Sequence, residues 1–225
     1  MANTREPVDE PLIKSEPHTS GVDQVMKKAP PKNLPDAMLK GLRPKQWVKN
    51  VLVLAAPLAA GADAFNSRTA VDILLAFVVF CFGASSIYLI NDARDVESDR
   101  RHPTKRFRPI ASGMLPINLA YVMAALLIAL SLGLSLLATD GTSLAWVIGI
   151  YIALQLGYCF GWKHIPVIDI ALVSSGFMLR TMAGGVAAGI DLSQWFLLVA
   201  AFGSLFMACL LYTSDAADDP LRVDL

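Results

Sequence analysis

The sequence contains little cysteine, and so offers little for thiol or zinc chemistry. Only three cysteines occur in 225 residues, Cys81, Cys159 and Cys209, and each lies within or at the edge of an apolar block. Their spacing fits neither a zinc site nor a redox pair, so we interpret them as small buried residues of helices. The chain also lacks net charge, but that average conceals a marked asymmetry along the sequence.

Apolar residues, in contrast, are in excess. They make up 55% of the chain, whereas a soluble domain averages about 45–50%. They form six blocks of the length that a helix needs to cross the hydrocarbon core. The blocks cover residues 47–62, which Pro57 interrupts, and residues 70–90, 117–138, 143–161, 166–190 and 194–212. Because an open structure can satisfy its backbone in lipid only as a helix, the sequence predicts an all-α integral membrane protein with its transmembrane domain at residues 40–212.

The regions outside these blocks predict the orientation. Residues 1–39 contain six prolines and few large apolar side chains, a composition typical of a disordered tail. Basic residues gather just before the first block, in residues 91–116 and in residues 162–165, whereas the opposite side has only Arg68. The positive-inside rule therefore predicts a multi-pass plasma-membrane protein whose N-terminus and long 91–116 loop are cytoplasmic.

Four polar residues follow the second block: Asn91, Asp92, Asp95 and Asp99. If the helix continues through them, a rotation of about 100° per residue places the three aspartates within a wedge of about 60°. Carboxylates so close repel one another unless a cation lies between them, and Mg²⁺ prefers carboxylates together with substrate phosphate oxygens. The alternative is a solvated helix end whose charges are balanced by nearby arginines. The position at the end of a membrane helix favours a Mg²⁺–diphosphate site built around Asn91, Asp92, Asp95 and Asp99.

A basic stretch comes directly after the aspartates and includes Lys105, Arg106 and Arg108. Arginine can bind phosphate oxygens through two parallel hydrogen bonds. Cytoplasmic loops are basic in any case, so topology alone could account for any single one of these residues. The whole run beside the aspartates favours a ligand that carries several phosphates.

Three further polar residues fall within apolar blocks: Asn50, Asp169 and Arg180. Ionisable residues inside a spanning helix are unfavourable in lipid and usually face a cavity. Asp169 and Arg180 are eleven residues apart, which returns to nearly the same helix face about 16 Å along. We expect all three to line the substrate cavity. The alternatives are an interhelical hydrogen bond for Asn50 and a structural ion pair for Arg180.

Three long stretches together resemble a known group of enzymes. The pattern Asn-Asp-x-x-Asp-x-x-x-Asp resembles the first aspartate motif of the UbiA superfamily of intramembrane transferases. The sequence on either side of this motif resembles the decaprenyl-phosphate phosphoribosyltransferases of actinobacterial cell-wall synthesis, over roughly residues 39–207. The stretches are LRPKQWVKNVLVLAAPLAAG, SSIYLINDARDVESDRRHPTKRFRPIASG and KHIPVIDIALVSSGFMLRTMAGGVAAGI. The resemblance implies a UbiA-like transmembrane helix bundle.

The resemblance also implies a reaction. A polyprenyl (decaprenyl) phosphate accepts 5-phosphoribose from phosphoribosyl pyrophosphate, diphosphate leaves, and the product feeds arabinan synthesis for the cell wall. Mg²⁺ on Asp92 and Asp95 would neutralise the leaving diphosphate, and Asp99 would complete or orient that shell. Tyr158 and Lys163 would flank the diphosphate from a facing loop. The implied partners are the two substrates and the lipid bilayer, with no nucleic acid and with homo-oligomerisation left open.

The last residues depart from the pattern of that group, whose members continue to about nine helices. Asp215, Asp218 and Asp219 resemble, in place and type, the second aspartate motif of the aromatic prenyltransferases of the superfamily. That likeness would favour a prenyl diphosphate with an aromatic acceptor. We instead interpret residues 208–225 as the artefactual end of an incomplete gene model, which would leave six of the helices. A non-enzymatic transporter or scaffold is a third alternative, and it needs no metal at the aspartates.

Overall fold

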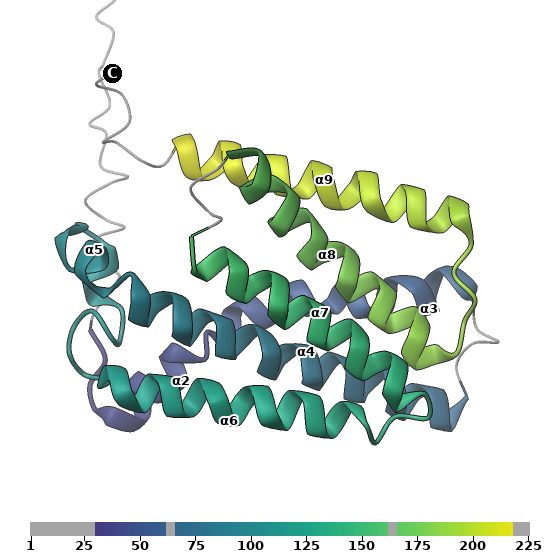
Figure 1. The fold of residues 1–225 in the computed structure, drawn as a ribbon, viewed down its shortest axis with the longest axis horizontal. Coiled ribbons are helices and arrows are strands. Elements are labelled where there is room, and N and C mark those ends of the chain that lie inside the picture. The colour runs from purple at the N-terminus through teal and green to yellow at the C-terminus, as the bar shows by residue number, and fades with distance from the viewer. Residues whose placement is uncertain (1–29, 62–65, 162–165, 218–225) are drawn as a thin grey trace, which may run out of the picture.

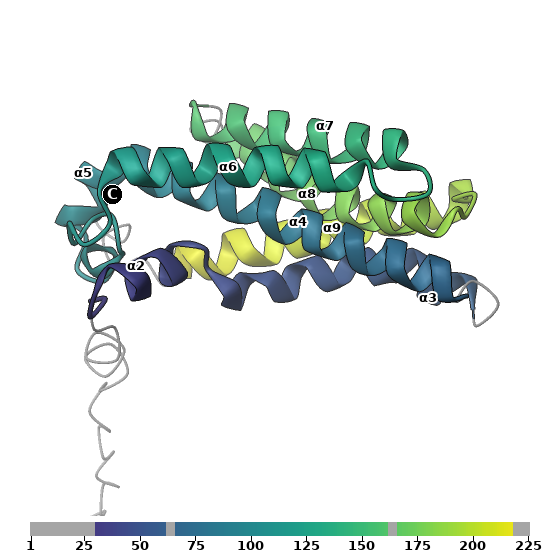
Figure 2. The ribbon, with the colours of Figure 1, turned by 90° about the horizontal axis from the view of Figure 1, so that it is seen from below.

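The computed structural model describes residues 30–61, 66–161 and 166–217, and all regular secondary structure within these ranges is helical. Five helices are long and apolar enough to cross a membrane, so the predicted all-α membrane architecture is confirmed. Figures 1 and 2 show these helices running along one common direction. They are α4 (Ser67–Arg94), α6 (Ile117–Ser135), α7 (Gly141–Cys159), α8 (Pro166–Ala188) and α9 (Gln194–Ala217).

Helix α4 lies in the centre of the bundle and contacts α6, α7 and α8 (Figure 2). Small residues allow this close packing: a side chain at Gly83 would meet Ser131 of α6 and Ile148 of α7 at 3.2–3.3 Å. Ser131 Oγ donates a 2.9 Å hydrogen bond to the carbonyl of Val79, so its hydroxyl is satisfied within the bundle. The outer helices α6 and α9 instead expose large apolar side chains, which suits contact with lipid. They include Val122, Leu126, Leu130, Trp195, Val199, Phe202 and Phe206.

The first apolar block does not form the single helix that we predicted over residues 47–62. It forms a long 3-10 helix, η1 (Pro44–Leu54), followed by the short α-helix α3 (Ala55–Ala60). A 3-10 helix is narrower than an α-helix and rises about 2.0 Å per residue, so η1 and α3 together extend about 31 Å, close to the thickness of the hydrocarbon core. Figure 2 shows them running beneath α4 from one end of the bundle to the other.

The narrow η1 and the start of α3 pack closely against α8. A side chain at Gly184 would overlap the carbonyl of Val53, so only glycine lets the two backbones approach this closely. Pro57, which has no N–H to donate, lies against the same glycine at 3.3 Å from the position of its missing Cβ. This tertiary contact is a feature that the apolar composition of residues 47–62 could not predict.

Helix α2 (Leu34–Gly41) lies partly within residues 1–39, which we predicted to be a disordered tail. The Asn33 side chain caps its start by accepting a 3.0 Å hydrogen bond from the Asp36 amide. Lys40 forms a 2.9 Å ion pair with Asp36 one turn earlier. The boundary at residue 39 is therefore wrong, because local capping and an i,i+4 pair order these residues. Residues 1–29 lie outside the described part of the chain.

The two ends of the bundle differ. One end carries α2, the short helix α5 (Val96–Arg101) and the 3-10 turn η3 (Lys105–Phe107) (Figure 1). At the other end, the buried Asp72 accepts a 2.5 Å hydrogen bond from Thr139 Oγ1, and Arg68 Nε lies 3.5 Å from the same carboxylate. Arg68, Asp72 and Thr139 thereby connect α4 to the turn between α6 and α7. The predicted aspartate and arginine cluster lies at the first end.

Candidate functional site

The helix does not continue through the aspartates as we assumed. Helix α4 ends at Arg94, and Asp95 adopts φ −89° and ψ 9° before α5 begins at Val96. Hydrogen bonds still cross the break, from the Asp95 amide to the Asn91 carbonyl at 2.9 Å and from the Asp99 amide to the Asp95 carbonyl at 2.8 Å. The break is therefore a change of direction rather than a loop.

Asp92 and Asp99 converge on one arginine. Arg108 Nη1 lies 3.1 Å from Asp92 Oδ1 and 2.7 Å from Asp99 Oδ2. Asp92 also receives Arg43, whose Nη2 lies 2.6 Å from Oδ1 and 2.7 Å from Oδ2. Both carboxylate side chains are only 4% exposed. Two buried carboxylates and two guanidinium groups thus form one cluster at the end of the bundle.

Arg43 is a member of this cluster that the sequence did not single out as a site residue. Its backbone lies in the left-handed region, with φ 53° and ψ 57°, a conformation that costs a non-glycine residue about 1–3 kcal/mol. The strained turn directs the chain from α2 into η1, and the guanidinium stacks over the Tyr88 ring at 5.0 Å as well as pairing with Asp92. Ser85 Oγ supports the same turn by donating to the Leu42 carbonyl at 2.8 Å.

Burial and neighbouring charges both affect the ionisation of Asp99. Burial raises the pKa of its carboxyl above the ordinary value, and the nearby charges of Asp92 and Asp95 raise it further. The ion pair with Arg108 acts in the opposite direction without reversing the shift. Asp99 is therefore harder to ionise than an exposed aspartate, chiefly because it is buried, and a cation placed beside it would favour its charged form.

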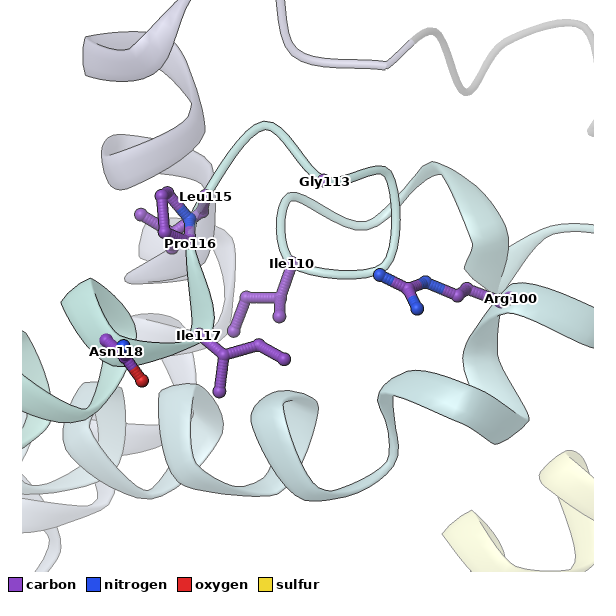
Figure 3. Close-up of a pocket in the computed structure, with 7 residues that line it drawn as sticks. All are labelled: Arg100, Ile110, Gly113, Leu115, Pro116, Ile117 and Asn118. Atoms are coloured by element: carbon purple, nitrogen blue, oxygen red, sulfur yellow. The ribbon is translucent and has the colours of Figure 1, made fainter.

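The remaining basic residues of the stretch have different surroundings. Lys105 and Arg106 lie in η3 and are exposed. Arg100 donates to the Ala111 carbonyl at 3.2 Å and to Glu97 at 3.2 Å, away from the aspartates. It also borders a cavity of about 410 Å³ between α5 and the start of α6 (Figure 3). The cavity is otherwise lined by Ile110, Gly113, Leu115, Pro116, Ile117 and Asn118, so it does not include the carboxylates.

The end of α7 approaches the same end of the bundle. Arg94, the last residue of α4, stacks over the ring of Phe160, with 4.4 Å from its Cζ to the ring centroid. Tyr158 precedes this contact by two residues and is half-buried, so its predicted place near the site is compatible with the fold. Lys163, predicted to act beside it, lies outside the described residues, as do Asp218 and Asp219.

Asn50 and Arg180 form a separate cluster deeper in the bundle. Arg180 donates to Asn50 Oδ1 at 2.8 Å, to Tyr151 Oη at 3.0 Å and to the Gly176 carbonyl at 2.6 Å. Asn50 Nδ2 donates in turn to Cys81 Sγ at 3.2 Å. Cys81 precedes Asp92 by eleven residues on α4, which corresponds to about 16 Å.

Arg180 is also surrounded by aromatic rings. Its Cζ lies 4.9 Å from the centroid of Tyr151, 5.7 Å from that of Phe80 and 6.0 Å from that of Phe177. Among the described residues no carboxylate lies within ion-pair distance of it. Asp169, the partner that we considered on the same helix, is half-buried in the first turn of α8. The predicted cavity residues thus do not form one group.

The carboxylates fit a hard divalent cation only in part. Since Asp92 and Asp99 both reach one nitrogen of Arg108, a single cation at that position would contact both. Asn91 Oδ1 is buried and accepts no hydrogen bond, so this oxygen is available as a further metal ligand. Within the described residues, however, no three His, Cys, Asp or Glu side chains gather at metal-binding distances. Mg²⁺ commonly binds through one or two carboxylates, waters and substrate phosphates, so the oxygen set fits if a phosphate completes it.

Together these features define a class: a multi-pass α-helical membrane protein with a polar, mixed-charge site at one end of its bundle. Within that class, residues 50–225 match the model of the UbiA prenyltransferase family. The chain belongs to this family, and the resemblance predicted from the aspartate motif is confirmed at the family level.

Curated relatives are similar over most of the chain. The decaprenyl-phosphate phosphoribosyltransferase of Corynebacterium glutamicum is 78% identical over 198 residues, which are 88% of this chain and 60% of the relative. The enzyme of the same name from Mycolicibacterium smegmatis is 62% identical over 182 residues, 80% of this chain and 57% of the relative. The chain therefore spans about three fifths of the length of these relatives.

A solved structure shares the fold. The UbiA homologue from Archaeoglobus fulgidus, solved with GPP and Mg²⁺, superposes with a TM-score of 0.71 over 80% of this chain and 64% of that one. The sequence identity is 20%, so the likeness extends to the arrangement of the helices and not to the substrate.

Proposed function

We propose that this chain provides the donor site of a decaprenyl-phosphate phosphoribosyltransferase. In this reaction an oxygen of the polyprenyl phosphate attacks C1 of phosphoribosyl pyrophosphate, the bond from C1 to the diphosphate breaks, and diphosphate leaves. The observation that carries the proposal is the 78% identity to the Corynebacterium glutamicum enzyme over 88% of this chain. The cluster of Asp92, Asp99, Arg43 and Arg108 supplies the chemistry that such a donor needs.

The side chains have complementary roles in this proposal. Asp92 and Asp95, with the side-chain oxygen of Asn91, would hold Mg²⁺, and Asp99, which shares Arg108 with Asp92, would complete or orient that shell. When bound, the metal would neutralise the charge that develops on the departing diphosphate. Arg43 and Arg108 lie where their guanidinium groups could bind phosphate oxygens. Lys105 and Arg106, exposed in η3, are placed to attract the 5-phosphate or the acceptor phosphate from the membrane surface.

The proposed nucleophile places little demand on general-base catalysis. A lipid phosphate is already anionic, so it needs no strong base, and positioning two anionic substrates is most of the task. We propose that the site faces the cytoplasm, because the basic residues cluster at the bundle end that carries α2, α5 and η3. Tyr158 and Lys163 would approach the diphosphate from the end of α7 and the segment after it.

The test compares donors in membranes. Membranes that contain this chain, or the Corynebacterium glutamicum relative as a positive control, receive Mg²⁺, decaprenyl phosphate and labelled phosphoribosyl pyrophosphate. Label should move into the lipid fraction. A parallel reaction offers labelled geranyl diphosphate with 4-hydroxybenzoate, a donor and an acceptor for an aromatic prenyltransferase. Transfer only in this second reaction would contradict the proposal.

A further inference from the structure

The carboxylate that a metal would need is already occupied in this structure. Asp92 receives Arg43 on both oxygens, at 2.6 and 2.7 Å, and Arg108 on Oδ1 at 3.1 Å. A carboxylate has about four lone-pair sites, and the two guanidinium groups use three of them on Asp92. A metal that binds Asp92 therefore competes with these arginines for its oxygens.

The exposed fractions indicate which groups can move. The side chain of Asp92 is 4% exposed, whereas those of Arg43 and Arg108 are 25% and 27% exposed. The carboxylate lies on a short side chain in the last turn of α4, whereas each arginine side chain is long and about a quarter exposed. The arginines can thus turn outward while Asp92 remains in place.

We propose that Arg43 is an exchangeable counter-ion of the site. It neutralises Asp92 when no metal is present, and it moves to the diphosphate when the metal and its ligand bind. This inference rests on the proposed function, because it takes the metal–diphosphate site as given. Arg43 would thus have two successive partners that are both negatively charged, first a carboxylate and then a phosphate.

The contact of Arg43 with Tyr88 supports an exchange over a permanent structural ion pair. The Tyr88 ring, 5.0 Å from the guanidinium carbon, gives the cation a second contact that does not depend on Asp92. The guanidinium therefore stays near the site when the carboxylate is taken by another cation.

The exchange predicts effects of opposite sign for one substitution. In Arg43→Gln the metal no longer has to displace this guanidinium, so the affinity of Asp92 for a divalent cation alone should rise about tenfold or more, corresponding to about 1.4 kcal/mol. The same variant lacks a cation for the phosphate oxygens, so its affinity for diphosphate at saturating metal should fall by about tenfold or more. A residue with a purely structural role would weaken both affinities together.

The experiment uses the full 225-residue chain in lipid nanodiscs, with Mn²⁺ as the probe and its electron paramagnetic resonance as the readout. Mn²⁺ is titrated alone, and inorganic diphosphate is then titrated at saturating Mn²⁺, so that no measurement depends on turnover. Arg100→Gln is the matched control, because Arg100 is a neighbouring arginine that donates to Glu97 and to the Ala111 carbonyl. Its two affinities should equal those of the wild type.

Each outcome decides a different claim. Tighter Mn²⁺ binding with weaker diphosphate binding in Arg43→Gln supports the exchange. Mn²⁺ affinity that is unchanged or weaker, in protein that binds Mn²⁺–diphosphate, overturns the exchange and leaves the proposed function intact. Failure of the wild type to bind Mn²⁺ even with diphosphate overturns both. If Arg43→Gln does not fold, Arg43→Lys keeps the charge but lacks the planar guanidinium that binds both oxygens of Asp92, and it should still tighten Mn²⁺ binding alone.

Discussion

Replacement of Gly184 by alanine tests the close contact between η1 and α8. The added Cβ would overlap the carbonyl of Val53 and would lie 3.3 Å from the Pro57 ring. Neither neighbour is the end of a flexible side chain, so the clash can be relieved only by moving the η1 backbone away from α8. Gly149→Ala on α7 is the matched control, because nothing lies within 4 Å of the position of its Cβ.

The magnitude follows from two opposing effects. Overpacking in a dense interior costs about 1–3 kcal/mol, and a backbone neighbour places Gly184→Ala toward the upper part of that range. Replacing glycine by alanine within a helix raises the free energy of unfolding by about 0.5–1 kcal/mol. We therefore expect the free energy of unfolding to fall by about 2 kcal/mol for Gly184→Ala. Gly149→Ala should be neutral or more stable by up to about 1 kcal/mol.

The assay is thermal unfolding of each variant in the same nanodiscs. For a chain of this size, 1 kcal/mol shifts the midpoint by about 2–4 °C, so Gly184→Ala should unfold roughly 4–8 °C below the wild type. Gly149→Ala should unfold at or slightly above the wild-type temperature. Equal midpoints for Gly184→Ala and Gly149→Ala would refute the close approach of η1 and α8.

Three further substitutions test the site and its support. Asp92→Asn should lower phosphoribosyl transfer, measured with the labelled donor, by at least about 10²-fold. Asp36→Asn on α2 is the control and should match the wild type. Equal activity of the two variants would contradict a metal role for Asp92. Arg180→Met should lower the free energy of unfolding by about 2–3 kcal/mol, because Asn50 and Tyr151 lose a buried donor; a wild-type unfolding temperature would contradict this. Because the folded pKa of Asp99 is raised, its ionisation destabilises the fold as the pH rises from the ordinary aspartate value, near 3.9, through the raised one. The unfolding temperature of Asp99→Asn relative to wild type should therefore rise from pH 4 to pH 7, and a pH-independent difference would exclude this effect.

The long helices could be predicted from the sequence because their causes are local. Runs of apolar residues of the right length allow only a helix in lipid, and α4 and α6–α9 lie close to the predicted blocks. Residues 47–62 looked equivalent by composition, yet they form η1 and α3. They pack against Gly184, more than one hundred residues away, in a close backbone contact that no local pattern records.

The site was predictable in its residue types and less so in its geometry. Carboxylates at a helix end beside a basic run indicated an anionic ligand with a metal, and two of the three aspartates do share one arginine. The break at Asp95 and the pairing of Arg43 with Asp92, 49 residues apart, were not predictable. Each depends on how η1 enters the bundle, which is decided by tertiary packing rather than by spacing.

Helix η1 and the residue before it make two polar contacts with α4 at different levels along the α4 axis. Asn50 bonds to Cys81 at one level, and Arg43 pairs with Asp92 at another, eleven residues later on α4, or about 16 Å along its axis. The seven residues from Arg43 to Asn50 rise about 14 Å in a 3-10 helix but only about 10 Å in an α-helix. An α-helical η1 with the same anchor at Asn50 would leave Arg43 several ångströms short of Asp92. The 3-10 form that Gly184 permits is therefore what brings the exchangeable cation to the carboxylate, so the packing of η1 on α8 sets the charge balance of the site.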